Sequence, residues 1–386
     1  MKKLIILFTL SLLLGSCSNL PANEIPIKPA PVVNAMETDN PKEKTIPIDV
    51  SLEKPIVTSV KLVAIGDILI HQPVYWDAAT PQGGYNFTSM FTKVKPFLEE
   101  ADIAVANQET MIGGAELGLS GYPLFNSPYE IGDALKEAGI DLVTLANNHT
   151  LDQGEKGIRN ALAYWDRIGM AYTGAFKSNA DQENIRTVIK DGIGFSFLSY
   201  SYGTNGLPVP EDKEYLINLI DLSLIKQDVE KAKALSDVVV VSMHWGNEYE
   251  KEPNQMQLGL AKELSNMGVD IIIGHHPHVL QPMDWIERVD GSKTFVMYSL
   301  GNFLSAQDGL ERMTGGIGGI EITKTTSTGK SVISLSNPSF IPTYAYNKNK
   351  RNFSIIPMVQ LNDSYLSNYL SYYESTQDHM MTLIKE

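Results

Sequence analysis

The chain has almost no cysteine and no extended basic segment. Its 386 residues include one cysteine, Cys17, so no disulfide bond can form within the chain. The formal net charge is −14, and Lys and Arg cluster only at the very start and at residues 348–351, which argues against binding to nucleic acid. The apolar run at residues 4–14 is too short to span a bilayer comfortably.

The N-terminus has the layout of a secretory signal. Lys2 and Lys3 precede the apolar run, which ends in the letters LGSC at Cys17. This ending resembles a bacterial lipobox, in which the cysteine is lipidated; an ordinary signal peptide with an incidental cysteine is the alternative. We predict a lipoprotein signal peptide at residues 1–17 and an extracytoplasmic protein anchored to the bacterial cell membrane, since acyl chains supply about 0.8 kcal/mol per buried CH₂.

Composition divides the remainder into three parts. Residues 18–57 are rich in proline and show no sustained helical or strand period, which is typical of an extended tether. Residues 58–345 are predicted to form a single large α/β domain, and residues 346–386 a mostly helical extension. His379, in that extension, is predicted to face solvent.

Strand and helix patterns alternate through the central part, which is typical of a layered α/β fold. Strands are expected at residues 59–65, 102–106, 140–146, 238–241, 271–273 and 294–300. Helices are expected at residues 87–100, 131–138, 154–169, 222–235 and 250–268. Hairpins are expected around Asp191-Gly192, a type I′ signal, and around Thr328-Gly329.

Three of the buried strands end in histidine or asparagine. These residues are Asn147, Asn148 and His149 in the first, His244 in the second, and His275, His276 and His278 in the third. In an open α/β sheet, ligands bind at the carboxyl ends of the strands, so these side chains should converge and hold a metal. Pro277 should keep the backbone between its two neighbouring histidines extended. A histidine-rich surface loop is the alternative.

Carboxylates occupy comparable positions. Asp67 ends the first strand, with His71 four residues later, and Asn107 and Glu109 end the second. Asp67 is equally consistent with a helix N-cap or a turn, and Asp152 with a helix cap. A mixed set of carboxylate, amide and imidazole ligands favours Mn, Zn or Fe over Ca²⁺.

Six short segments, in this order, resemble the CapA family of capsule and poly-γ-glutamate biosynthesis proteins, also called PgsA-like. They are Gly66-Asp67, Asn107-Gln108-Glu109, residues 146–154, His244-Trp245-Gly246, His276-Pro277-His278-Val279 and Ser299-Leu300-Gly301-Asn302-Phe303. The family is similar to the calcineurin-like metallophosphoesterases. The resemblance implies a four-layer α/β/β/α sandwich with two divalent ions at the strand ends.

The resemblance also implies roles for individual residues. Asn148, His244 and His276 would complete one metal site, and Asp67 and His278 the other, with Glu109 bridging them. His149 would protonate the leaving group; the alternative is that His149 only orients Asn148. Further candidate site residues are His71, Asn107, Asp152, His275 and Asn302. The sequence departs from the phosphoesterase pattern at Leu69, where those enzymes have histidine, and at Glu109, where they have aspartate.

These observations favour a metal-dependent hydrolase that attacks a phosphoester or amide of an envelope polymer such as poly-γ-glutamate. A non-catalytic, metal-containing factor that binds the anionic polymer and assists its export or assembly is the alternative. Expected partners are the polymer, the membrane through Cys17, and membrane-embedded polymer synthase subunits. Whether the protein is catalytic stays open at this point.

Overall fold

The structure, a computed structural model, describes residues 54–384. The expected signal peptide, Cys17 and most of the tether lie outside these residues. Glu53–Glu386 form one compact unit, built around two β-sheets. Among the described residues, no helix is both long and apolar enough to cross a membrane.

The first sheet has eight strands and the second has six. The first follows the order β14 (Ser354–Pro357), β13 (Lys330–Tyr346), β12 (Thr314–Ser327), β1 (Ile56–Ile68), β2 (Ile103–Gln108), β3 (Leu142–Thr144) and β4 (Ala171–Thr173), with β11 (Asn302–Leu304) pairing with β1. The second follows the order β5 (Arg186–Lys190), β6 (Ile193–Ser201), β7 (Val238–His244), β8 (Ile271–His275), β10 (Lys293–Leu300) and β9 (Leu280–Glu287).

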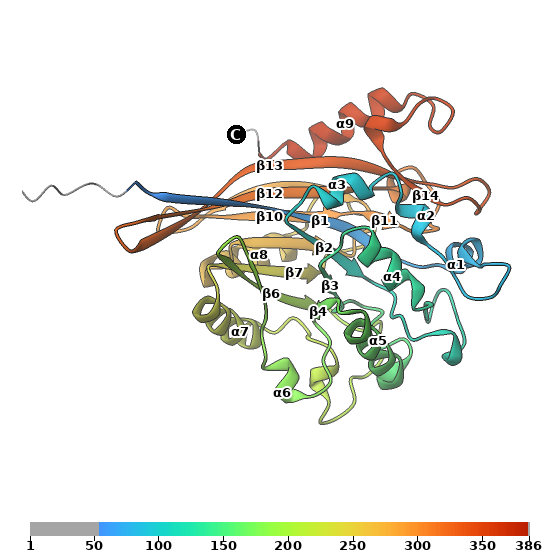
Figure 1. The fold of residues 1–386 in the computed structure, drawn as a ribbon, viewed down its shortest axis with the longest axis horizontal. Coiled ribbons are helices and arrows are strands. Elements are labelled where there is room, and N and C mark those ends of the chain that lie inside the picture. Colours follow the sequence, from blue (N-terminus) through green and yellow to red (C-terminus); the bar gives the residue numbers. More distant parts are fainter. Residues whose placement is uncertain (1–53, 385–386) are drawn as a thin grey trace, which may run out of the picture. The chain divides into compact units, whose positions relative to one another are not determined.

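The sheets pack face to face, with helices on both outer surfaces (Figure 1). One apolar core joins the inner faces, as where Leu62 and Val105 of the first sheet share a cluster with Val240 and Ile273 of the second. The first sheet's outer face is covered by α1 (Gln72–Ala78), α2 (Thr88–Phe91), α3 (Lys95–Glu99), α4 (Glu130–Glu137) and α5 (Gly154–Ile168). The second sheet's outer face is covered by α7 (Leu222–Leu235) and α8 (Gln255–Met267). This arrangement confirms the expected α/β/β/α sandwich.

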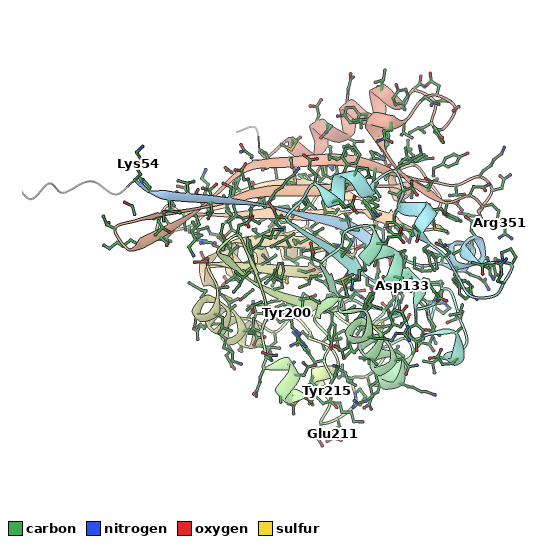
Figure 2. The ribbon with its side chains drawn as sticks, in the orientation of Figure 1. Lys54, Asp133, Tyr200, Glu211, Tyr215 and Arg351 are labelled. Carbon is green, nitrogen blue, oxygen red and sulfur yellow. The ribbon has the colours of Figure 1, made fainter. Side chains whose placement is uncertain are left out.

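Parallel pairing brings the polar strand ends to one edge. Strands β1 to β4 run parallel in the first sheet, as do β6, β7, β8 and β10 in the second. In Figure 2, Lys54, just before β1, lies at the opposite end of the strands from Arg351, and Tyr200 lies on β6 between them. The carboxyl ends of these strands therefore carry the candidate site.

Some local predictions are confirmed and others are wrong; the helix expected at residues 250–268, for example, begins only at Gln255. Asp191 (φ 47°) and Gly192 (φ 75°) both have positive φ, as a type I′ hairpin between β5 and β6 requires. The single helix expected at residues 87–100 is wrong, because the chain forms the separate helices α2 and α3. Pro96 lies in the first turn of α3, where its missing N–H and fixed φ favour a helix start.

The C-terminal helix α9 (Tyr369–Met381) packs over β9 and β13. Met380 is fully buried in the inter-sheet core, and Gln377 Nε2 donates to the Phe340 carbonyl at 3.0 Å. His379 is half-buried, with Nε2 3.2 Å from the Leu280 carbonyl, so the solvent-facing position expected for it is wrong. The short helix α6 (Asn179–Gln182) precedes β5.

Candidate metal centre

Asp67, near the end of β1, contacts three polar side chains. Its Oδ1 accepts a hydrogen bond from Asn107 Nδ2 at 2.8 Å and lies 3.1 Å from His275 Nδ1. Its Oδ2 lies 3.2 Å from His278 Nδ1. Burial would raise the pKa of Asp67, but the interactions with His275 and His278 outweigh it and hold this pKa well below its usual range. The carboxylate is therefore charged in the folded protein.

Glu109, just after β2, is fully buried between two imidazoles. Its Oε1 lies 3.5 Å from His278 Nε2 and 3.7 Å from His244 Nε2. Neither oxygen has a hydrogen-bond partner in the described part of the chain, and burial raises the pKa of Glu109 well above its usual range. Burying a carboxylate without donors is costly, so this position favours a neighbouring positive charge.

Asn148, His244 and His276 form a second group beside Glu109. His244 Nε2 lies 2.8 Å from Asn148 Oδ1, and the rings of His244 and His276 are 4.9 Å apart between centroids. Burial lowers the pKa of His276 to about 3 and that of His244 well below its usual range. Both imidazoles are neutral, so each can offer a nitrogen lone pair to a cation.

The loop after β8 has an unusual backbone. His276 has a φ of 98° and His278 a φ of 56°, so the extended backbone expected around Pro277 is wrong. A non-glycine residue at such φ values costs about 1–3 kcal/mol and persists only where neighbours impose it. Asn302 supplies one such restraint, because its Nδ2 donates to the His278 carbonyl at 3.4 Å. At Gly274, a Cβ would lie 2.0 Å from a backbone oxygen of Tyr298, so only glycine fits.

His149 and Asp152 form a pair next to this group. Asp152 Oδ2 lies 2.7 Å from His149 Nδ1 and accepts the Phe125 backbone N–H, also at 2.7 Å. Asp152 therefore orients an imidazole, and its interpretation as a helix cap is wrong: Gln153 occupies the N-cap of α5. With Nδ1 donating to the carboxylate, Nε2 of His149 is left for the adjoining cavity.

That cavity has a volume of about 260 Å³ and is lined by His71, His149, His278, Glu248 and Tyr249, among others. His71 Nδ1 lies 3.1 Å from the Leu69 carbonyl, and the His71 ring meets the Phe125 ring edge to face at 5.2 Å. Phe125 makes the same contact with His149 at 4.7 Å. His71 is therefore a wall of the cavity and stands apart from the group of Glu109, His276 and His278.

The residues present fit a bound cation. One ligand atom from each of Glu109, His276 and His278 lies within 4.8 Å of the others. Both Glu109 oxygens and Nδ1 of His276 are buried without hydrogen-bond partners among the described residues. Buried polar groups are normally paired, so these orphaned atoms are consistent with metal coordination by oxygen and nitrogen.

Tyr202 and Asn205 lie in the loop after β6. The glycines and prolines of residues 202–214 predict a loop that borders the site, but they do not single out these two residues. The Tyr202 ring packs on His276 with centroids 4.6 Å apart. Asn205 Oδ1 accepts a hydrogen bond from Asn148 Nδ2 at 3.2 Å, which turns Asn148 Oδ1 toward His244. The clue in the sequence was the Asn-Gly pair at 205–206: both residues have positive φ and form a tight turn.

We expect Asn205→Gly to weaken metal binding by about tenfold to 100-fold, because outer partners that orient a ligand have effects of this size. Glycine tolerates the φ of 52° at this position, so the change removes the amide without straining the turn. Metal titration by calorimetry measures the affinity. Asn349→Gly is the control, since Asn349 has a similar φ of 53° in an exposed turn. Equal affinities in both variants would contradict the role of Asn205.

Comparison with known proteins adds independent information. Residues 61–307 match the family model described as "Bacterial capsule synthesis protein PGA_cap". The chain is 30% identical over 292 residues to the "PGA biosynthesis protein CapA" of Bacillus subtilis (strain 168), covering 71% of this chain and 68% of that protein. It is 31% identical over 238 residues to the "Capsule biosynthesis protein CapA" of Bacillus anthracis, covering 58% of this chain and 55% of that protein.

A more distant similarity is to a "Probable polyglutamine synthesis accessory protein" of Mycobacterium tuberculosis (strain CDC 1551 / Oshkosh). The two are 26% identical over 180 residues, covering 43% of this chain and 45% of that protein. The chain thus spans about two thirds of the length of the first relative and about half of the other two. The segment that matches the family model contains every candidate site residue from Asp67 to Asn302.

Proposed function

Since this chain belongs to the bacterial capsule synthesis protein family PGA_cap, we propose that it is a metal-dependent hydrolase that acts on poly-γ-glutamate or a related capsule polymer. The observation that carries the proposal is Glu109, which is fully buried between His244 and His278 without a hydrogen-bond partner among the described residues, beside a cavity that exposes His149. The names of the relatives, which refer to capsule, PGA and polyglutamine synthesis, support the choice of polymer.

In this proposal, the metal ligands and the proton donor have separate tasks. Asp67, Glu109 and His278 would hold one divalent ion, and Asn148, His244 and His276, with Glu109, a second. Such ions supply positive charge that acidifies water and stabilises negative charge developing on a substrate oxygen. His149, oriented by Asp152, would hold a proton on Nε2 and give it to the leaving group.

The cellular setting is also part of the proposal. The lipobox-like ending at Cys17 and the proline-rich residues 18–57 support a lipoprotein that acts outside the cytoplasm on a tether. Membrane-embedded polymer synthase subunits would then be close enough to be partners.

A second candidate function is binding without catalysis. It is favoured by Leu69, which stands where phosphoesterases have a metal-binding histidine and is itself buried. In this case the metal centre would bind carboxylates of the polymer, and the protein would assist export or assembly of the polymer.

Elemental analysis and a hydrolysis assay test both functions. Purified protein should contain Mn, Zn or Fe near stoichiometric level, and should cleave an aryl phosphoester or a γ-glutamyl oligomer until a chelator is added. Metal-loaded protein that binds the oligomer without cleaving it would favour the second function. Absence of any transition metal would contradict both.

A further inference from the structure

The cavity beside His149 adjoins two further hollows. The first of these, about 600 Å³, shares Tyr249 with the His149 cavity. The second, about 220 Å³, shares Val279, Glu311 and Tyr372 with the first. The three spaces therefore follow one another away from the candidate metal centre, and we call the outer two the outer groove.

The outer groove joins the metal-binding loop to the C-terminal part of the chain. Its floor includes Val279, directly after His278, and Leu280. Its far wall comes from α9 and residues around 311–314, which lie beyond the segment 61–307 that matches the family model. The Tyr372 hydroxyl lies 3.1 Å from Thr314 Oγ1, and this contact fixes α9 against the wall. The outer groove therefore depends on the placement of the C-terminal helix.

The polar groups of the outer groove suit a chain of amides that carries carboxylates. Thr314, Ser375 and Thr376 supply hydroxyls that donate to the Leu310 and Tyr372 carbonyls, so their oxygens remain able to accept from amide N–H groups. The Arg312 guanidinium lies over the Tyr249 ring, 5.1 Å from its centroid, and forms no ion pair with a carboxylate among the described residues. A guanidinium that packs on an aromatic ring and has no carboxylate partner keeps N–H groups for an anionic ligand, and it can recognise a carboxylate with two parallel hydrogen bonds.

The other basic groups near the groove already have acidic neighbours. Lys251 pairs with Glu311, and His379 Nδ1 lies 3.8 Å from Glu252. Glu248 lines the inner cavity and is not among the residues that line the outer groove. Arg312 is thus the cation best placed to attract an anionic group into the groove.

We propose that the outer groove binds an extended γ-linked glutamate chain, with Arg312 holding a carboxylate of a residue next to the linkage at His149. This inference rests on the proposed function and adds a specificity site to it. The C-terminal helix then has a role: it makes the protein prefer long polymer over short fragments.

Binding of γ-glutamyl oligomers of increasing length to the metal-loaded protein tests the inference. For the natural chain, affinity should rise with length until the outer groove is filled. Arg312→Gln should lower the affinity for long oligomers by about tenfold, the effect of losing charged hydrogen bonds to one carboxylate. Ser375→Glu, which adds a like charge on the exposed face of α9, should have a similar effect and leaves Arg312 intact.

Arg167→Gln is the matched control. The Arg167 guanidinium also lies over a tyrosine ring, that of Tyr164, at 4.0 Å on α5, so the substitution removes the same charge and the same ring contact elsewhere. Arg167→Gln should bind oligomers of every length as the natural chain does. If the natural chain shows length-dependent affinity that Arg312→Gln and Ser375→Glu leave unchanged, the outer groove is not the site. If the natural chain binds no oligomer, the proposed function fails as well.

Discussion

Replacing His149 by alanine is expected to slow hydrolysis by the metal-loaded protein by about 10²–10⁴-fold, the usual contribution of a positioned general acid. The metal content should stay unchanged, because the contacts of His149 are with Asp152 and Phe125 and not with the carboxylates at the strand ends. With Nδ1 held by Asp152 at 2.7 Å, Nε2 is the nitrogen that can hold the transferable proton.

The choice of substrate makes this test specific for proton donation. An aryl phosphoester has a leaving group that departs readily as an anion, whereas an alkyl ester or an amide needs a proton. His149→Ala should therefore impair the second class of substrate more than the first. Asp152→Asn should cause a smaller loss, because the imidazole remains but loses its charged partner. An equal loss for both substrate classes, or loss of metal, would contradict the role of a proton donor.

The edge that carries the candidate site could be predicted because parallel strands impose it. Residues 238–241 and 271–273 form neighbouring parallel strands, so His244 and His276, which follow them, must lie at the same edge of the sheet. Asp67 and Asn107 meet by the same rule, which their 2.8 Å hydrogen bond reflects. The periodicity of apolar side chains was sufficient to predict this edge, because the direction and register of parallel strands fix where the strands end.

Loop geometry was not predictable, because it depends on contacts between distant residues. The φ of 98° at His276 opposes the preference of a residue before proline, and only surrounding contacts, such as that of Asn302, sustain it. Asn205 reaches Asn148 from a loop without any period. The contact of the Tyr372 hydroxyl on α9 with Thr314 likewise joins two residues that no sequence pattern connects.

Replacing Glu109 by glutamine is expected to abolish stable metal binding. Outer partners of metal ligands alone contribute about tenfold to 100-fold in affinity, so loss of the carboxylate that lies between His244 and His278 should exceed that range. Elemental analysis of the purified variant measures the loss. Glu99→Gln is the control, since it removes one negative charge from an exposed position on α3.

The same substitution should change stability in opposite directions with and without metal. With metal, the natural chain should be more stable than Glu109→Gln, because a ligand at 100 times its Kd adds about 2.7 kcal/mol to the free energy of unfolding. In chelator the order should reverse at neutral pH, because burial raises the pKa of Glu109, so that folding of the natural chain must either bury its charge or take up a proton, whereas the variant buries a neutral amide. Thermal unfolding with and without chelator measures both differences. A natural chain that is indifferent to chelator, or a variant that is the less stable under both conditions, would show that burial of Glu109 serves packing and not a cation.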